Sequence, residues 1–378
     1  MKRTLYTSEH EAFRSSFRSF LDREAAPHID QWEAAGTPDR TFITSAAANG
    51  YLGFEFDPAV GGLGIEDFRY NAVMTEEVVA SGMAGDTFTM QNDIIVPYLR
   101  DLATAEQQER WLPRFTAGDL VTALGMTEPG AGSDLAGLAT RAVKVEGGWE
   151  LKGQKVWTSG AHEADWGICL ARTDKDVPKH KGLSYFLVDM RSTGVEVRPL
   201  KQSTGDAEFN EVFLDSVFVP DAYLLGEPGQ GWRITATTLQ NERTQISAGV
   251  SVGTEEALRS MISQGSYTGG ESEAFASLGH VAALSSAIGA LNLRETLRRV
   301  NGMNPGAGSS LAKVAHARLT REAASRVLAL AGPGALFASA PGDAVTGQLT
   351  VPQVLIGGGT VEIQLNVIAE RILGLPRT

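Results

Sequence analysis

The sequence predicts an α+β protein of several domains: an N-terminal all-α domain, a middle antiparallel β-barrel or sandwich, and a C-terminal four-helix bundle. Apolar residues recur at helical spacing near the start, short apolar runs fill the middle, and helical spacing returns after Gly231. A chain of 378 residues is also too long for one ordinary core. The changes of pattern place the domains at residues 1–118, 119–226 and 227–378.

The N-terminal domain is predicted to be helical. An apolar stripe at steps of three and four residues follows the cap candidate Ser8, which is the pattern of a half-buried helix. The stripe consists of Phe13, Phe17, Phe20 and Leu21. Residues 104–107, Thr-Ala-Glu-Gln, form a capping-box pattern that opens another helix. The glycines within 60–64 interrupt the helical pattern and predict a loop.

The middle domain is predicted from short apolar runs that end at turn residues. Even spacing of such runs is typical of an antiparallel sheet or barrel. The runs are 166–171, 183–188, 194–199 and 212–219. After Gly231 the chain returns to long segments rich in Ala, Leu and Arg, with interruptions at 264–270 and 301–306. These segments predict roughly four helices joined by loops, which is a bundle.

Composition narrows the class of protein. Hydrophobic residues at 43% and charged residues at 21% are typical of a soluble globular chain, and the net charge of −12 argues against nucleic acid and anionic membranes as partners. The single cysteine, Cys169, excludes an internal disulfide and suits a reducing cytoplasm. We also expect no signal peptide and no stretch as long as a membrane span. The six histidines lack metal-ligand spacing, so no metal site is expected.

The most informative segment is the loop Gly125–Asp134. It holds three glycines, two hydroxyls and two carboxylates, directly after the apolar run 120–124. Such a loop offers backbone N–H groups and hydroxyls to a flat, polar ligand. It is neither a G-x-G-x-x-G fingerprint nor a Walker A loop.

Three further segments carry candidate chemistry. Residues 155–160 read as a strand with an aromatic residue and two hydroxyls, residues 357–364 contain three successive glycines, and 241–243 is Asn-Glu-Arg. Taken alone, the first is an ordinary strand and the last an exposed Glu–Arg pair on a helix. Together with the Gly125–Asp134 loop, however, the segments resemble the acyl-CoA dehydrogenase family, and the order helix, sheet, helix extends that resemblance over nearly the whole chain.

The resemblance implies an FAD cofactor and an acyl-CoA substrate. In the family, a tryptophan packs on the flavin ring and a hydroxyl two residues later bonds near flavin N5; Trp157 and Ser159 match these positions. Glu128 and Asp134 are candidates to hold the shape of the loop instead. The implied cofactor contacts are Leu124, Met126, Thr127, Gly132, Ser133, Trp157, Ser159, Thr360 and Glu362. The implied substrate contacts are Ser133, Arg243, Gly358 and Gly359.

The position of the catalytic base departs from the commonest family pattern. Many members have a glutamate immediately before the Gly-Thr pair, and this chain has Gly358 there. Isovaleryl-type, long-chain and steroid-side-chain members instead carry the base on a helix of the C-terminal bundle, immediately before an arginine that contacts CoA. Glu242–Arg243 resembles that pair. The resemblance therefore implies that Glu242 removes the α-proton while the β-hydride moves to flavin N5. The product would be the 2,3-enoyl-CoA, with electrons passing to an electron-transfer flavoprotein.

Two other motifs of the family are altered. The region 258–267 lacks the usual Phe-Gly pair, and 328–334 replaces the usual glutamine and glycine run. In the family both motifs reach the FAD of a neighbouring subunit. Two assemblies stay open: a homo-oligomer (dimer or tetramer), or a heterotetramer with a related subunit. Three alternatives also stay open: a non-catalytic or half-site subunit, an oxygen-using flavin oxidase or hydroxylase, and a carrier-protein thioester in place of CoA.

Overall fold

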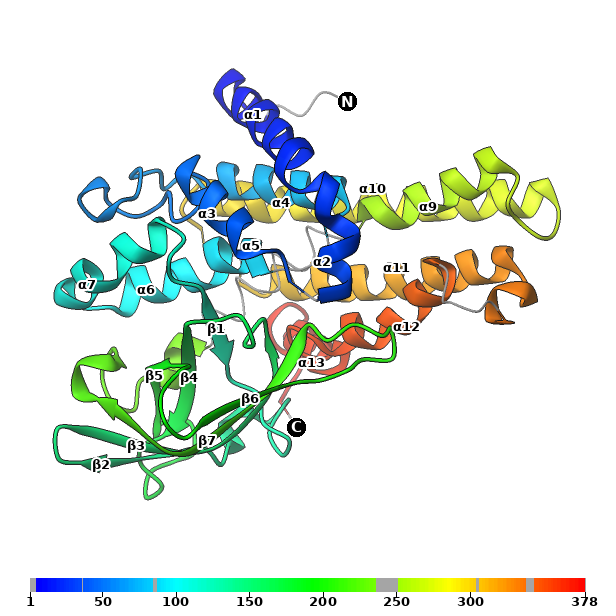
Figure 1. The fold of residues 1–378 in the computed structure, drawn as a ribbon. Helices are drawn as coiled ribbons and strands as arrows, with labels where there is room; N and C mark the ends of the chain where they lie inside the picture. The colour runs from blue at the N-terminus through cyan, green and yellow to red at the C-terminus, as the bar shows by residue number, and fades with distance from the viewer. Residues whose placement is uncertain are drawn as a thin grey trace. The chain divides into compact units, whose positions relative to one another are not determined.

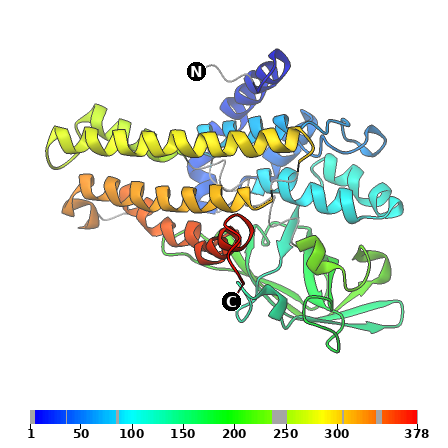
Figure 2. The same ribbon diagram turned by 180° about the vertical axis from the view of Figure 1, so that it is seen from behind.

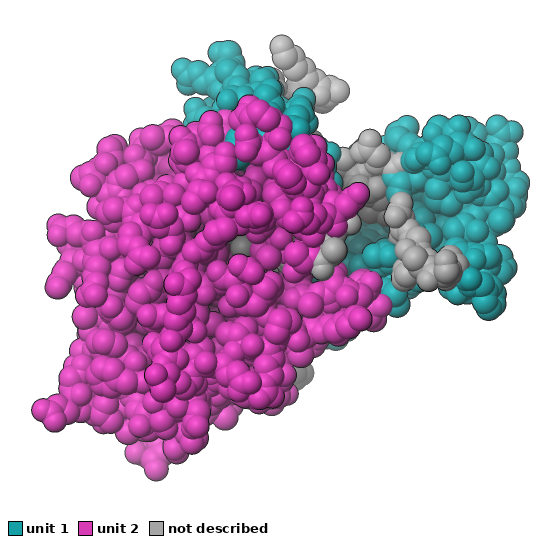
Figure 3. Space-filling model, viewed as in Figure 1, with its two compact units in different colours: residues 1–22, 67–83, 239–378 teal, residues 23–66, 84–238 magenta. Residues whose placement is uncertain are grey.

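The computed structural model describes residues 5–35, 37–83, 87–235, 251–303, 306–337 and 343–377 (Figure 1). The chain forms two compact units. Unit 1 consists of residues 1–22, 67–83 and 239–378, and unit 2 of residues 23–66 and 84–238 (Figure 3). Both units are therefore built from segments that are far apart in the sequence.

Unit 1 is helical. Its longest helices, α10 and α11, run alongside each other (Figure 2). Its elements are α1 (Ser8–Glu24, of which residues to 22 belong to this unit), α4 (Arg69–Ser81), α9 (Ser251–Gln264), α10 (Glu271–Val300), α11 (Gly308–Ala331), the 3-10 helix η6 (Pro333–Phe337), α12 (Asp343–Ile356) and α13 (Val361–Arg371). The core between α9, α10 and α11 contains Leu258, Ala274, Val281, Ile288, Leu319, Ala323, Val327 and Leu330. Helical spacing after residue 250 thus predicts the C-terminal helices correctly.

Helix α1 confirms the apolar stripe after Ser8. Phe17 and Phe20 are buried, while Phe13 is half-buried. The polar side of the helix is tied to α4 through Glu77, which is only 3% exposed. Its carboxylate accepts from Arg14 Nη1 at 2.8 Å and from Arg18 Nε at 2.7 Å. A buried carboxylate with two guanidinium partners keeps the N-terminal helix on α4.

Helix α10 corrects the expectation that no stretch is as long as a membrane span. By length and composition alone, this helix is long and apolar enough to cross a membrane. It is rich in Ala, Gly and Ser, and these small residues let neighbouring helices approach closely. Ala274, Val281 and Ile288 point into the core of unit 1. The described structure therefore packs one side of α10 on the core of unit 1.

Unit 2 begins with helices and ends with a sheet. Its helical elements are η1 (Ala26–His28), α2 (Ile29–Ala35), α3 (Arg40–Ala48), η2 (Pro58–Val60), α5 (Thr87–Met90), the π-helix η3 (Gln91–Ile95), α6 (Val96–Leu102), α7 (Ala105–Thr116), η4 (Leu135–Gly137) and η5 (Asp221–Tyr223). The predicted capping box opens α7: Gln107 N donates to Thr104 Oγ1 at 3.2 Å, and Thr104 N donates to Gln107 Oε1 at 2.8 Å. The glycines at 61–64 lie in a loop, as predicted.

The strands of unit 2 form one open sheet rather than a closed barrel. They are β1 (Thr122–Gly125), β2 (Arg141–Val145), β3 (Gly148–Ser159), β4 (Trp166–Arg172), β5 (Leu183–Asp189), β6 (Val195–Pro199), β7 (Phe209–Pro220) and β8 (Leu224–Leu225). The order is β6-β7-β3-β2-β4-β5-β8, with β1 beside β4. Most pairs are antiparallel, but β4 pairs in parallel with β1 and with β2. The barrel expectation is wrong because β6 and β8, at the two ends of this order, do not pair among the described residues.

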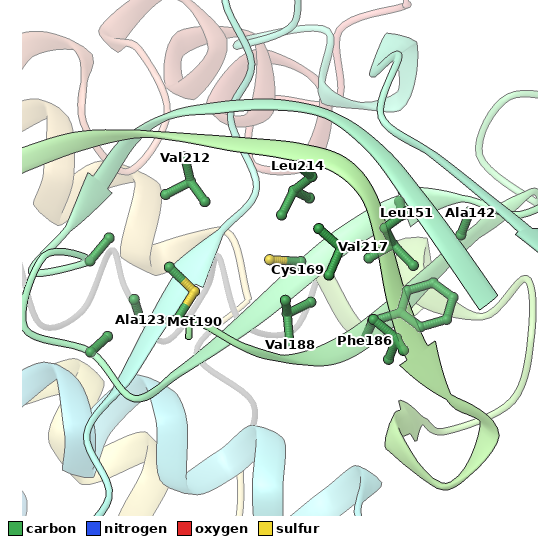
Figure 4. Close-up of a cluster of buried hydrophobic side chains, with 14 residues drawn as sticks. Ala123, Ala142, Leu151, Cys169, Phe186, Val188, Met190, Val212, Leu214 and Val217 are labelled. Carbon is green, nitrogen blue, oxygen red and sulfur yellow. The ribbon is translucent and has the colours of Figure 1, made fainter. Parts of the chain in front are cut away.

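Side chains from several strands fill the core of the sheet (Figure 4). Leu151 of β3, Phe186 of β5 and Leu214 of β7 pack around Cys169 of β4. Burial raises the pKa of the Cys169 thiol to about 11. The single cysteine is therefore a packed core residue at neutral pH rather than a reactive thiolate.

Candidate functional site

The Gly125–Asp134 loop leaves the end of β1 and returns through a tight turn. Glu128 N donates to Ala131 O and Ala131 N donates to Glu128 O, both at 3.1 Å. Thr127 O accepts from Val156 N at 2.9 Å, which places the loop beside β3. The two segments that the sequence singled out in this half of the chain are therefore neighbours in space.

A buried ion pair holds the loop from beneath. Lys155 Nζ lies 2.8 Å from Glu128 Oε1 and 3.2 Å from Met126 O. The Glu128 carboxylate also accepts from Ala139 N at 2.6 Å and from Thr140 N at 3.0 Å. Burial is the largest influence on the pKa of Glu128 and raises it, but the Lys155 charge and these hydrogen bonds together lower the pKa below its ordinary value. Glu128 thus ties three segments of the chain together, a function that sequence reasoning left as an alternative.

The outer side of the loop is open. Gly132 and Ser133 are exposed, and Met126 and Thr127 are half-buried. A Cβ on Gly132 would meet no heavy atom within 4 Å, so the backbone there is accessible to a ligand. Asp134 is exposed and pairs with Lys179 at 2.7 Å. The loop therefore has a packed inner face and an outer face free to bind.

Trp157 is the most unusual residue of the site. The pairing of β3 with β7 shifts register between Lys155 and Thr158, and Trp157 in this bulge has a φ of 58°. Its side chain is 57% exposed and meets Phe209 in a T-shaped contact with ring centroids 5.7 Å apart. A bulky residue at positive φ is strained, and a large exposed aromatic side chain leaves apolar surface in water, which is unfavourable. Such features concentrate at binding sites. Ser159, two residues on, is half-buried opposite Phe209.

The glycine segment of unit 1 precedes α13. Thr360 is the N-cap of this helix and accepts from Ile363 N at 3.2 Å. Gly358 and Gly359 have φ angles of 66° and 89°, which L side chains rarely adopt. Glu362 is exposed in the first turn of α13. A side chain at position 358 would be strained in this backbone conformation.

Gln364 holds the glycine segment in place, and sequence reasoning gave it no role. Its side chain is fully buried. Nε2 donates to Gly358 O at 3.3 Å and to Gly359 O at 3.4 Å, while Oε1 accepts from Ser310 Oγ at 2.8 Å. The available signal was a polar residue four positions after a helix cap, a position that faces back toward the preceding loop.

The predicted site residues fall in both units. Leu124 to Ser133 and Trp157 to Ser159 come together in unit 2, and Gly358 to Glu362 lie in unit 1. Glu242 and Arg243, the expected base and its neighbour, lie outside the described residues. In the described ranges no group of three or more His, Cys, Asp or Glu side chains is placed to hold a metal ion.

Family models match most of the chain. The acyl-CoA dehydrogenase N-terminal domain matches residues 7–119, the middle domain residues 123–217, and the C-terminal domain residues 229–373. Acyl-CoA dehydrogenase FadE34 of Mycobacterium tuberculosis is 45% identical over 287 residues, which are 74% of this chain but 39% of that protein. Acyl-CoA dehydrogenase IpdE1 of the same species is 31% identical over 385 residues, covering 97% of this chain and 98% of that protein.

Solved structures agree with these matches. An acyl-CoA dehydrogenase from Geobacillus kaustophilus has a TM-score of 0.90 at 29% identity, covering 98% of this chain and 100% of that one. A chain of the ChsE4-ChsE5 complex from Mycobacterium tuberculosis has a TM-score of 0.87 at 27% identity, and the match covers 100% of this chain and 100% of that one. Helical N-terminal, sheet-containing middle and helical C-terminal regions follow one another in the order that this fold requires. The chain belongs to the acyl-CoA dehydrogenase family, a family of flavoprotein oxidoreductases.

Proposed function

We propose that the chain is an FAD-dependent dehydrogenase that converts an acyl-CoA thioester to the 2,3-enoyl-CoA. The observation that carries this proposal is Trp157, whose exposed indole stands at positive φ beside the Gly125–Asp134 loop. A flat, apolar surface next to open backbone N–H groups suits a ring system with one hydrophobic face and a polar edge. The isoalloxazine ring of FAD is such a ligand.

The residue types of unit 2 suit the chemistry of a flavin ring. Ser159 supplies a hydroxyl two residues after the indole, and Thr127 and Ser133 supply two more from the loop. The Glu128–Lys155 pair keeps these groups in register without occupying the outer face. We propose as cofactor contacts Leu124, Met126, Thr127, Gly132, Ser133, Trp157, Ser159, Thr360 and Glu362. Bound FAD would supply hydride acceptance, and the protein the position of the substrate.

Glu242 is the proposed base. Its residue type and the following Arg243 match the family members that have no glutamate before the Gly-Thr pair. The φ of 66° at Gly358 supports this choice, because a glutamate there would have to adopt a left-handed backbone. Glu242 would take the α-proton, with Ser133, Arg243, Gly358 and Gly359 as substrate contacts. General base catalysis requires this carboxylate within hydrogen-bond reach of the α-carbon proton.

The proposed physiological setting is cytoplasmic, with an electron-transfer flavoprotein as electron acceptor. We further propose domains at 1–118, 119–226 and 227–378. The first candidate for the assembly is a homo-oligomer. The second is a heterotetramer with a related subunit, supported by the match to the ChsE4-ChsE5 complex and by the altered motifs at 258–267 and 328–334. In that case the partner would complete the FAD site.

Anaerobic reduction tests the function. Oxidised protein is mixed with a panel of acyl-CoAs of varied length and branching, and the flavin absorbance near its visible maximum is followed. We expect bleaching with at least one thioester, and a loss of at least about 100-fold in its rate in Glu242→Gln. Glu271→Gln, an exposed glutamate in the first turn of α10, is the matched control and should bleach at the wild-type rate. If Glu242→Gln bleaches at the wild-type rate, the assignment of Glu242 as the base is wrong.

Flavin content tests the assembly. The chain expressed alone is passed over a sizing column, and its FAD per protein is measured. Stoichiometric FAD in a dimer or tetramer supports the homo-oligomer. Substoichiometric FAD that rises to one per site on coexpression with a related subunit supports the heteromer. Oxygen consumption driven by NADH without any thioester bleaching would instead favour an oxidase or hydroxylase.

A further inference from the structure

A buried chain of hydroxyl groups lies behind the Gly125–Asp134 loop. Tyr98 of α6 donates to the Tyr185 hydroxyl of β5 at 3.0 Å, and that hydroxyl lies 2.7 Å from Thr235 Oγ1. Thr235 belongs to the helical turn 231–235. The three residues are 2%, 0% and 1% exposed, so the chain is shielded from water. It joins three elements of unit 2 that are remote in the sequence.

The hydrogen bonds of this chain run in one direction. Thr235 Oγ1 donates to Gly231 O at 2.8 Å, so its hydroxyl proton is committed to the helix. Thr235 Oγ1 can therefore accept from Tyr185, whose one hydroxyl proton also faces Met126 Sδ, and Tyr185 accepts from Tyr98. The Tyr98 and Tyr185 rings also pack edge to face, with centroids 5.1 Å apart and planes at 71°. A directed chain in a dry interior is stiff, since no water can replace a broken link.

The same hydroxyl chain touches the loop through Met126. The Sδ atom of Met126 lies 3.3 Å from the Tyr185 hydroxyl and 3.9 Å from the Tyr98 hydroxyl. On the other side, Met126 O accepts from Lys155 Nζ at 3.2 Å. Both the side chain and the carbonyl of Met126 are therefore held from within unit 2.

We propose that Tyr185 is a positioning residue that holds Met126 and the helical turn 231–235 in fixed positions relative to each other. The inference rests on the proposed function, because Met126 is a proposed flavin contact. Hydride transfer requires the flavin ring to be held in fixed register with its substrate. Tyr185 thereby fixes the inner side of the loop whose outer face is proposed to meet the flavin.

The contact is tested without activity. Methionine methyl groups are labelled with ¹³C in the full-length protein, and the Met126 signal is assigned through Met126→Leu. We expect Tyr185→Phe and the isosteric Thr235→Val each to shift this signal, because both break the hydroxyl chain. Thr235→Ser keeps the hydroxyl and should leave the signal in place. Tyr223→Phe is the matched control, since this tyrosine packs on Trp111 and Trp166 elsewhere in unit 2.

The consequence for catalysis is tested by the reductive half-reaction. We expect the bleaching rate to fall about tenfold in Tyr185→Phe and Thr235→Val with KM within about twofold, and Thr235→Ser to restore it. An unmoved Met126 signal in both variants overturns the proposal, as do bleaching rates within twofold of wild type in both. If no acyl-CoA bleaches the wild-type protein, the proposed function fails. The Met126 signal by itself then tests whether Tyr185 and Thr235 position Met126.

Discussion

Replacing Lys155 by methionine tests whether the ion pair beneath the Gly125–Asp134 loop holds it in place. The Lys155 side chain is fully buried and that of Glu128 is 6% exposed, with 2.8 Å between Nζ and Oε1. Methionine keeps most of the apolar stem and removes the charge. Glu128 would then be a buried carboxylate without a cationic partner, which costs about 3–5 kcal/mol of unfolding free energy. The retained bonds from Ala139 N and Thr140 N place the expected loss near the lower end, about 3 kcal/mol.

The same strand offers a matched control. Lys152 Nζ pairs with Asp215 at 2.9 Å, but the two side chains are 52% and 78% exposed. Solvent screens such a pair, so Lys152→Met should cost at most about 1 kcal/mol. Urea unfolding at pH 7 and saturating FAD measures both variants. A loss below about 1 kcal/mol in Lys155→Met, equal to that in Lys152→Met, would refute the reasoning. Adding Glu128→Gln to Lys155→Met should recover part of the loss, because the amide has no charge to desolvate.

The ion pair also predicts a pH dependence. The pKa of Glu128 is lower in the folded protein than its ordinary value of 4.5. The carboxylate therefore contributes stability that is present above about pH 4.5 and lost as the pH falls through the folded pKa. In Lys155→Met, burial acts without the opposing charge and raises that pKa. Protonation of Glu128 then relieves the unpaired buried charge, so the stability difference between Lys155→Met and the wild type should narrow as the pH falls from 7 to 3, as unfolding measured over this range will show.

The other predictions concern groups outside the loop. Burial and then the charge of a neighbouring lysine lower the pKa of His316 to about 3, and neither ring nitrogen has a partner in the described part of the chain. Because the unfolded chain binds the His316 proton more readily, this histidine should lower the unfolding free energy by up to about 1.4 kcal/mol per pH unit as the pH falls from about 6 toward 3. His316→Leu should remove that contribution in a pH series of urea melts. Gly359→Ala places a Cβ 2.5 Å from Gln364 Nε2 at a φ of 89° and should lower the free energy of unfolding by about 1–3 kcal/mol. Gly347→Ala lies in open space on α12 and should raise it by about 0.5–1 kcal/mol. Equal effects of the two variants in thermal melts would contradict this prediction. Thr104→Ala should cost about 1 kcal/mol through the lost cap, and Thr104→Ser should restore it.

Local features were predictable from the sequence because their causes are local. A capping box needs two side chains three residues apart, and the Thr104–Gln107 pair forms as predicted. The runs at 166–171 and 183–188 became β4 and β5 because apolar, β-prone stretches between turn residues bury well in a sheet. The closed barrel was wrong for the opposite reason. Closure depends on which strands meet at the ends of the order, and apolar runs do not encode that pairing.

The candidate site divides in the same way. The family resemblance, rather than spacing alone, grouped the Gly125–Asp134 loop with Trp157, and the bond from Val156 N to Thr127 O brings the two segments together. The roles of Gln364 and Tyr185 could not be predicted. Each bonds to a residue far along the chain, Ser310 for Gln364 and Tyr98 for Tyr185, and a single sequence carries no sign of such a partner. Helix α10 shows the limit of composition, since one apolar pattern suits both a membrane span and a bundle core.

The sequence by itself predicted the family through a resemblance, the order of helical and sheet regions, and the residues proposed to contact a flavin and a thioester. These properties depend on short spacings and on periodicity, which act within a few residues. Only the tertiary structure decided that Lys155 is buried under the loop, that Trp157 stands exposed at positive φ, and that Tyr185 links Met126 to the helical turn 231–235. The physical reason is that burial, strain and hydrogen-bond partners are set when distant segments pack, and packing is a property of the folded chain.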